Sequence, residues 1–180
     1  MRRRRFLALA GSTASATATA AATAGCLSAL PGAGPPIDVG CPSFSADAES
    51  VCAHTASSPP VVLRPSSWTL SAGSGVALEV TFSNESDRDA HTGQFPSLKR
   101  REDGEWTHVW PMVKSGSGPT VAPGGSYSWE FRFEKERPAH ESDENVDLYA
   151  LDPGTCALVL GAGVGDRSYH CVAPFEVGGE

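Results

Sequence analysis

The stretch Val76-Ala-Leu-Glu-Val-Thr-Phe82 carries the clearest structural signal in this sequence. Its apolar residues alternate with the others, so that Val76, Leu78, Val80 and Phe82 fall on one face of an extended chain. A period of two is typical of a β-strand with one buried face. We therefore predict a strand here, packed on a core through these four side chains.

The same alternation recurs along the chain between turn signals. Residues 127–133 place Tyr127, Trp129, Phe131 and Phe133 on one side, and no window shows helical periodicity. Further strand candidates are residues 61–63, 68–70, 95–101, 105–110, 146–151, 155–160 and 168–177. Roughly seven to nine short strands with regular turns predict an all-β two-sheet sandwich over residues 61–178.

The N-terminus has the features of an export signal. Residues 2–5 are arginines, a long run of small residues follows, and Cys26 comes directly after Ala24 and Gly25. Arg4 and Arg5 before Phe6 resemble a twin-arginine signal, and the Ala-Gly-Cys resembles a lipobox whose cysteine is lipidated. We expect residues 1–25 to be removed and Cys26 to anchor the protein at the extracytoplasmic face of the cell membrane; the alternative is an ordinary cleaved signal in which Cys26 is incidental.

The charge of the exported form argues against some partners. The chain of 180 residues has a formal charge of −7, from 14 Lys and Arg against 21 Asp and Glu. Removal of four leader arginines leaves 10 against 21, or −11. Nucleic acid and anionic membrane surfaces require clustered basic residues, so we expect neither as a partner beyond the lipid anchor. The acidic, lysine-poor composition resembles that of haloarchaeal secreted proteins.

Four cysteines remain once Cys26 carries lipid, and in an exported chain they predict disulfides. Cys156 and Cys171 lie in two strand candidates on either side of the turn-rich residues 161–166. Opposed positions of such a hairpin are close enough to bridge, which favours Cys156–Cys171 and leaves Cys41–Cys52. The alternative, a metal site of four thiols, lacks any C-x-x-C pair.

Residues 26–60 are rich in Ser, Pro, Ala and Gly. This composition predicts a spacer between the anchor and the sandwich. The expected Cys41–Cys52 disulfide would close a small loop near its end, and the sequence leaves open whether that loop packs on the sandwich or stands apart.

Several segments resemble bacterial and archaeal immunoglobulin-like domains over about residues 61–178. The resemblance lies in the opening strand and Asn-x-Ser-Asp turn, a Gly-x-Trp strand, a Pro-Gly turn, the entry to a late strand and a closing strand. The segments are Leu78-Glu-Val-Thr-Phe-Ser-Asn-Glu-Ser-Asp87, Leu98-Lys-Arg-Arg-Glu-Asp-Gly-Glu-Trp106, Val121-Ala-Pro-Gly-Gly-Ser126, Leu151-Asp-Pro-Gly-Thr-Cys156 and Phe175-Glu-Val177. Proteinase inhibitors of the BsuPI type share similar signatures. The resemblance implies an immunoglobulin-like fold and no common catalytic set, and Cys156 stands where an aromatic residue is usual.

The sequence shows no recognisable catalytic or metal motif, so we predict no enzyme activity, cofactor or metal. The five histidines form no H-x-H or H-x-x-x-H group, and no Gly-x-Ser-x-Gly elbow occurs. The acidic residues 141–147 could bind Ca²⁺ through oxygens, although a solvated loop explains them as well. Asn84-Glu-Ser86 is a glycosylation sequon on an expected turn.

These expectations combine into a lipid-anchored, non-enzymatic module with a binding or structural role at the cell surface. Its partner would be a protein or a glycan. The alternative is a BsuPI-like protease inhibitor acting through an exposed loop, with residues 114–119 or 134–147 as candidates. A hydrolase with carboxylates converging from loops is the third hypothesis.

Overall fold

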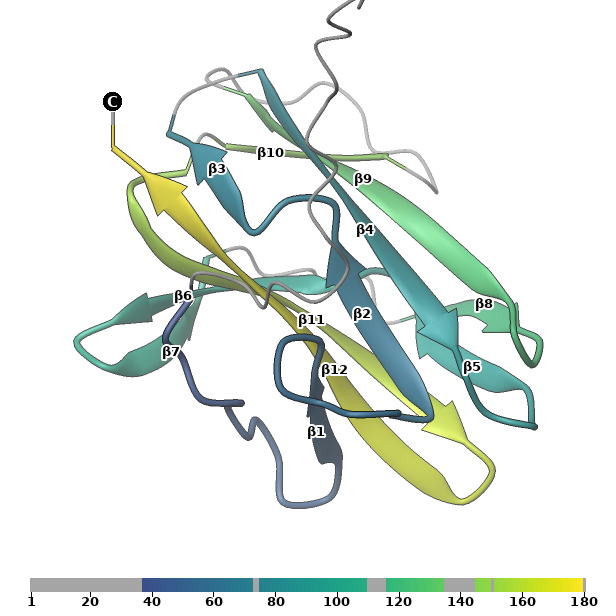
Figure 1. The fold of residues 1–180 in the computed structure, drawn as a ribbon. Coiled ribbons are helices and arrows are strands. Elements are labelled where there is room, and N and C mark those ends of the chain that lie inside the picture. Colours follow the sequence, from purple (N-terminus) through teal and green to yellow (C-terminus); the bar gives the residue numbers. More distant parts are fainter. Residues whose placement is uncertain (1–36, 73–74, 110–115, 135–144, 150, 180) are drawn as a thin grey trace, which may run out of the picture. The chain divides into compact units, whose positions relative to one another are not determined.

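The chain forms two β-sheets, described by a computed structural model for residues 37–72, 75–109, 116–134, 145–149 and 151–179 (Figure 1). No α-helix occurs in these ranges, which confirms the predicted all-β two-sheet sandwich. The strands are β1 (Glu49–Cys52), β2 (Val61–Pro65), β3 (Thr69–Ser71), β4 (Val76–Asn84), β5 (Ala90–Gly93), β6 (Ser97–Glu102), β7 (Glu105–His108), β8 (Ser117–Val121), β9 (Ser126–Glu134), β10 (Asn145–Tyr149), β11 (Gly154–Val164) and β12 (Arg167–Gly178).

The described strands number twelve, more than the sequence predicted. The additional ones are short, such as β1, β3 and β5, which have three or four residues each. A segment of that length contains too few alternations to stand out from a loop. Each is a strand because a long neighbour offers it free backbone groups.

The four-stranded sheet has the order β10-β9-β4-β2 and is built on the two best-predicted strands. β4 and β9 pair antiparallel over eight positions, from Val76 opposite Phe133 to Ser83 opposite Ser126. Leu78, Val80 and Phe82 are fully buried, as the alternation predicted. The inward register continues one step further, so the next inward residue of β4 is the polar Asn84.

The eight-stranded sheet is organised around the long β11–β12 hairpin. One side of β11 pairs with β6 near its start and with β5 near its end. The free side of β12 pairs with β1 and β3, both parallel. β7 extends β6 and β8 extends β5, so the short strands complete a sheet on either side of the hairpin.

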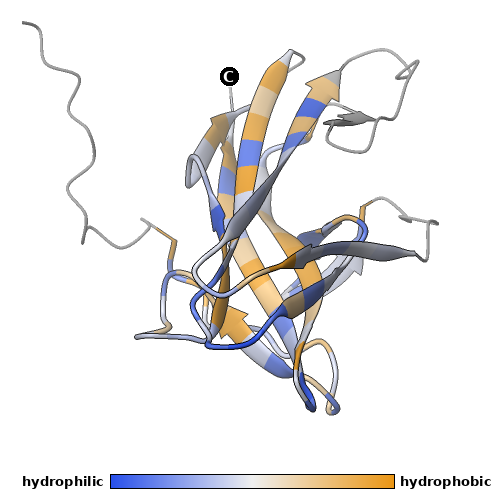
Figure 2. Ribbon diagram, turned by 90° about the vertical axis from the view of Figure 1, so that its right-hand side faces the viewer, coloured by the Kyte–Doolittle hydropathy of each residue, from blue (hydrophilic) through white to orange (hydrophobic). Residues whose placement is uncertain are grey.

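The main core lies between the two sheets. It contains Trp129, Phe131 and Phe133 from one sheet and Leu158 and Phe175 from the other, all buried. Apolar and polar residues alternate along the strands in Figure 2, as expected when one face of each sheet is covered. The indole of Trp129 donates to the Gln94 carbonyl at 3.0 Å, which satisfies its one polar atom.

A second, smaller core covers the outer face of the eight-stranded sheet. Cys52, Ala157, Val159 and Val172 form it, with Phe44 packed against them. The predicted Cys41–Cys52 disulfide is present and holds this N-terminal segment onto the sheet. Closing a loop of this length stabilises a fold by about 3 kcal/mol in the chain-entropy model.

The expected boundary between stalk and sandwich at residue 60 is wrong. The compact unit comprises Gly34–Glu180, and β1 within the expected stalk pairs with β12. Ile37 and Val39 are buried, and His54 donates from Nε2 to the Val39 carbonyl at 2.7 Å. The prediction failed because it used the overall composition of this segment, which is mostly small and polar, whereas a few apolar residues such as Val51 and Phe44 are enough to pack it onto the sheet.

The predicted Cys156–Cys171 disulfide is also wrong. Both thiols are free and buried, and Cys156 lies opposite Phe175, whereas Cys171 lies opposite Leu160. Four residues therefore separate the two cysteines along the ladder, or roughly 13 Å, which is beyond the reach of a disulfide. The predicted six-residue loop is in fact a two-residue turn, because residues 161–164 continue β11 and shift the register by four.

Candidate binding groove

An open groove of about 720 Å³ lies at the end of the sandwich where β2 begins and where β4 and β11 turn into β5 and β12. The β1–β2 loop forms one wall and the β4–β5 turn another, with side chains of β2 and β12 between them. The lining residues are Ala56, Ser58, Pro59, Pro60, Arg64, Glu85, Ser86, Asp87, Arg167 and Tyr169. The groove thus combines charges of both signs with apolar walls.

Asn84 fixes the wall that carries Glu85 and Asp87. Its Nδ2 donates to the carbonyls of Arg88 at 2.7 Å and Val121 at 2.8 Å. Its Oδ1 accepts from the backbone N–H of Ser86 at 3.1 Å and from the Ser86 hydroxyl at 2.6 Å. The Asn84 amide is therefore a buried support on which the turn is built.

The opposite wall is tied to the same turn through the backbone. The N–H of Glu85 donates to the Pro60 carbonyl at 2.8 Å. Within the β1–β2 loop, Ser58 has a φ of 54°, a left-handed conformation that costs a non-glycine residue free energy. The other non-glycine residue with a positive φ among those described is Asp103, where the Asp-Gly hairpin turn accounts for it.

The groove arginines are weakly paired compared with Arg100 and Arg132. Arg64 lies 3.9 Å from Glu85, and both side chains are about half exposed. Among the residues that the structure places, no carboxylate lies within ion-pair distance of Arg167. Such exposed pairs contribute little free energy, so a ligand can replace them at little cost.

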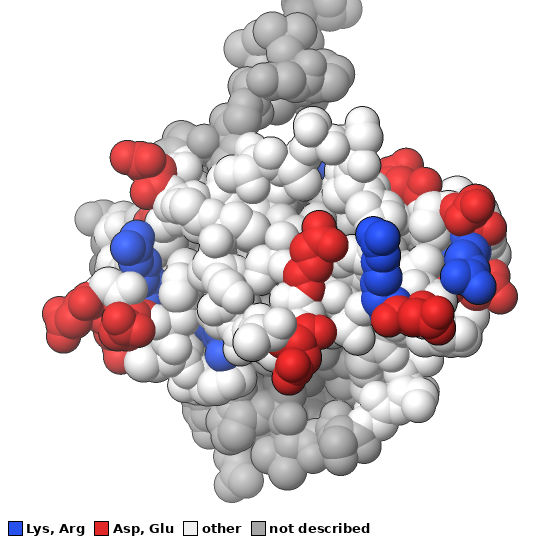
Figure 3. Space-filling view, turned by 90° about the horizontal axis from the view of Figure 1, so that it is seen from below, with Lys and Arg blue, Asp and Glu red and all other residues white. Residues whose placement is uncertain are grey.

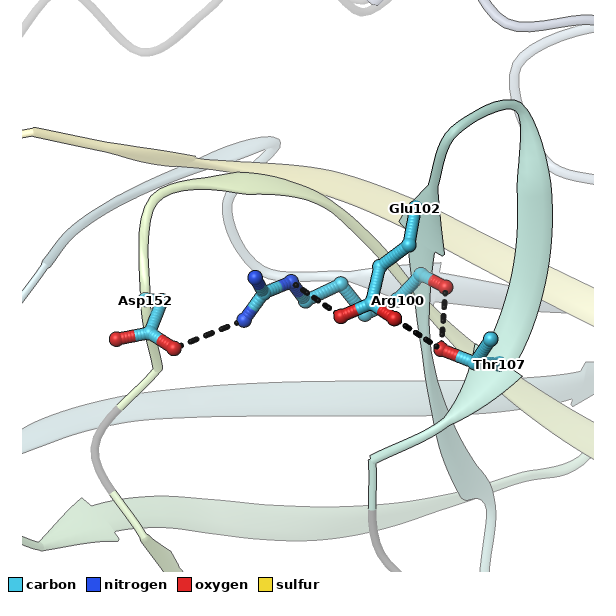
Figure 4. A network of polar contacts seen from close by, with 4 residues as sticks. All are labelled: Arg100, Glu102, Thr107 and Asp152. Carbon is cyan, nitrogen blue, oxygen red and sulfur yellow. Dashed lines mark hydrogen bonds and ion pairs between the residues drawn. The ribbon is translucent and has the colours of Figure 1, made fainter.

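Arg100 shows what a well-paired arginine looks like in this protein (Figure 4). Its Nη1 donates to Asp152 Oδ2 at 2.9 Å, and its Nε lies 3.4 Å from Glu102 Oε1. The hydrogen bond to Asp152 is the main cause that raises the pKa of Arg100 above its ordinary value. Thr107 donates to Glu102, which joins β7 to the network. This network joins the β6–β7 hairpin to the segment before β11, and within it Arg100, Glu102 and Asp152 each have a charged partner.

A second polar cluster lies under the N-terminal segment. Lys99 is buried, its Nζ donates to His108 Nε2 at 2.9 Å, and it lies 4.8 Å from the centre of the Phe44 ring. Phe44 contacts Trp106 edge to face. Burial lowers the pKa of Lys99 from its ordinary value. The cluster holds the N-terminal segment on the sheet and opens into no described pocket.

The prediction of a glycosylation site at Asn84 is wrong. Only 1% of Asn84 is exposed, and its Nδ2, the atom to which a glycan would be attached, already donates to two carbonyls. A glycan would require both bonds to break and the residue to leave the core. In the folded chain the sequon marks a structural turn.

The remaining predicted sites are only partly within the described residues. Cys26, Arg4 and Arg5 lie outside them, as do residues 141–144 of the acidic loop. Of the two candidate inhibitory loops, residues 117–119 belong to β8 and residues 145–147 belong to β10. Those two parts are thus paired strands, β8 with β5 and β10 with β9.

Sequence reasoning missed the groove. Its residues come from three separated segments, 56–64, 85–87 and 167–169, and neither a spacing nor a motif connects Arg64 with Arg167. The sequence marked Pro59-Pro60 and the turn after Asn84 as two separate loops. Nothing in it indicated that these two loops lie side by side. Within the described part of the chain, no three His, Cys, Asp or Glu side chains gather as a metal site. Nor do the described residues include a helix long and apolar enough to span a membrane.

Comparison with known proteins assigns no family. No family model matches this sequence. No curated protein matches it either. Any statement about its activity therefore depends on its own residues and geometry.

Some solved structures share a slight likeness. An X-ray structure of a Northeast Structural Genomics Consortium target has 11% identity and a TM-score of 0.41, covering 69% of this chain and 90% of that one. A β-glucosidase from Listeria innocua has 20% identity and a TM-score of 0.31 over 66% of this chain and 16% of its own. The sporulation control protein Spo0M from Bacillus subtilis has 12% identity and a TM-score of 0.32 over 68% and 50%. These likenesses are too slight to indicate a function.

Proposed function

We propose that this protein is a lipid-anchored, extracytoplasmic, non-enzymatic β-sandwich that binds a cell-surface component through the groove. The observation that carries the proposal is the groove itself, because it gathers Arg64 and Arg167 with little or no internal pairing beside rigid apolar walls. Concave sites with a few convergent polar groups are where proteins usually bind ligands.

The sequence of the leader supports the anchor, because Cys26 directly follows Ala24 and Gly25. The described sandwich begins at residue 37, eleven residues after Cys26 (37 − 26). The mixed surface charge suits an exposed extracytoplasmic protein. On the face seen in Figure 3, acidic and basic side chains lie beside one another, without one large basic patch.

Replacement of the lipid-bearing thiol tests the anchor. We expect Cys26→Ser to move the protein from the membrane pellet to the soluble fraction of the cell envelope or medium, because one acyl-bearing cysteine supplies the attachment. Immunoblots of fractionated cells measure the shift, and Arg132→Gln serves as an unrelated surface control. A Cys26→Ser protein that stays in the membrane fraction would contradict the anchor.

Photocrosslinking tests the groove. A photoreactive amino acid at Ser58 or Arg167, which line the groove, should crosslink the full-length protein to an envelope component in intact cells. The same amino acid at Arg132, an exposed residue of β9 paired with Glu130, is the matched control. A crosslinked species seen equally from Arg132, or none from the groove positions, would contradict binding through the groove.

A further inference from the structure

The two groove arginines define the charge of part of the ligand. A guanidinium is a planar fork of donors that matches a carboxylate or a phosphate. Arg167 has no carboxylate within reach among the described residues, and the 3.9 Å contact of Arg64 with Glu85 is too long for a good hydrogen bond. The two guanidinium groups that line the groove therefore suit an anionic group.

The carboxylates of the same groove require a ligand that also donates hydrogen bonds. Glu85 and Asp87 are exposed carboxylates in the same groove, and ionised carboxylates only accept. They repel a second anionic group or a backbone carbonyl, but they accept readily from hydroxyl groups. Ser58 adds a hydroxyl that can both donate and accept.

The walls and shape of the groove complete the description. Pro59 and Pro60, both partly exposed, supply rigid apolar surface against which the C–H face of a ring can pack. The groove is open, so a chain can continue beyond the part that is bound. Ser58 is held in a left-handed conformation in this wall, and backbone strain of this kind is concentrated at functional sites.

We propose that the groove binds an acidic saccharide, with a ring carboxylate on Arg167 and Arg64 and ring hydroxyls on Glu85 and Asp87. This inference rests on the proposed function and specifies its ligand. An acidic peptide could satisfy the arginines, but its carbonyl oxygens would face two carboxylates. A polyhydroxylated acid satisfies both the arginines and the carboxylates of the groove.

Binding of defined saccharides by the full-length protein tests the proposal. The probe is a uronic acid oligosaccharide, and its matched control is the same oligosaccharide with each carboxyl reduced to a primary alcohol. Isothermal titration calorimetry should show binding of the first and a loss of about tenfold or more in affinity for the second, because a charged hydrogen bond is removed.

Three variants locate the site. Arg167→Gln should weaken binding of the acidic oligosaccharide about tenfold, and Glu85→Gln should weaken it less, since an amide oxygen still accepts. Arg132→Gln should leave the affinity unchanged. Circular dichroism and unfolding curves verify that each variant is folded.

Each of the following outcomes would contradict the saccharide proposal, and each can be told apart from failure of the proposed function. Equal affinity for the acidic and the reduced oligosaccharide would show that the carboxylate is not recognised. Binding of an acidic peptide with dependence on Arg167, in the absence of saccharide binding, would assign the groove to a peptide. No binding of either, while groove crosslinks persist in cells, would refute the saccharide and retain a binding module with another ligand.

Discussion

Asn84→Ala should lower the free energy of unfolding by roughly 3 kcal/mol, because it removes a buried amide that makes four hydrogen bonds. The carbonyls of Arg88 and Val121 lose their side-chain donor. The main chain of Asn84 also bonds to Gly124 and Gly125 in the next turn, so the damage should extend to the β8–β9 connection. Urea unfolding followed by tryptophan fluorescence measures the change.

Two further variants separate the donor role of Asn84 from the turn around it. Ser86→Ala destroys the sequon but keeps both Nδ2 bonds, so it should cost about 1 kcal/mol. Asn84→Asp keeps the shape but places a carboxylate oxygen against two carbonyl oxygens, so it should cost at least as much as alanine. If Ser86→Ala and Asn84→Ala were equally harmful, the two Nδ2 bonds would not be what stabilises the turn.

The stability of the protein should fall as the pH rises above 9, because two buried thiols keep their protons in the folded state. Burial raises the pKa of Cys156 and of Cys171 from 9.0 to about 12. Above pH 9 the unfolded chain releases these protons and the folded chain does not, so alkaline pH favours unfolding. At about pH 10 each thiol should have lost about 1.4 kcal/mol of its contribution, or about 3 kcal/mol together.

A variant without the thiols isolates their effect. Cys156→Ala/Cys171→Ala should be less stable at neutral pH but should lack the part of the alkaline slope that they cause. The lowered pKa of Lys99 acts with the opposite sign and remains in both proteins, so it cancels in the comparison. Unfolding curves at about pH 8 and about pH 10 measure the two slopes.

Thiol chemistry supplies an independent check. The folded protein should leave Cys156 and Cys171 unreactive toward a disulfide reagent, and urea should expose both. Equal alkaline slopes in the two proteins, or rapid labelling in the folded state, would contradict the buried assignment.

The sequence predicted the strands whose alternation is long enough to read. β4 and β9 have nine residues each, and their inward faces could be named from the sequence because a strand has a strict period of two. The Cys41–Cys52 disulfide was predicted only as the pair left over from Cys156–Cys171, so the correct pairing came from a wrong premise. The leader, the anchor and the ligand remain predictions.

Register and long-range assembly required the tertiary structure. In the sequence, a hairpin in which glycines continue a strand looks the same as a hairpin with a longer loop. The actual β11–β12 register differs by four positions from the predicted one, and this difference separates Cys156 from Cys171. The structure also ruled out glycosylation of Asn84, because Asn84 is buried. The sequence alone cannot tell an exposed sequon from one whose asparagine points into the core.

The sequence by itself determined the two-layer β architecture, because side-chain alternation is local and depends only on the residues of a single strand. The tertiary structure decided the β11–β12 register, the docking of residues 37–52 and the groove, because each depends on which distant segments meet. Arg64 and Glu85 meet when β2 pairs with β4 in one sheet, whereas Arg167 joins the groove only when the two sheets pack together.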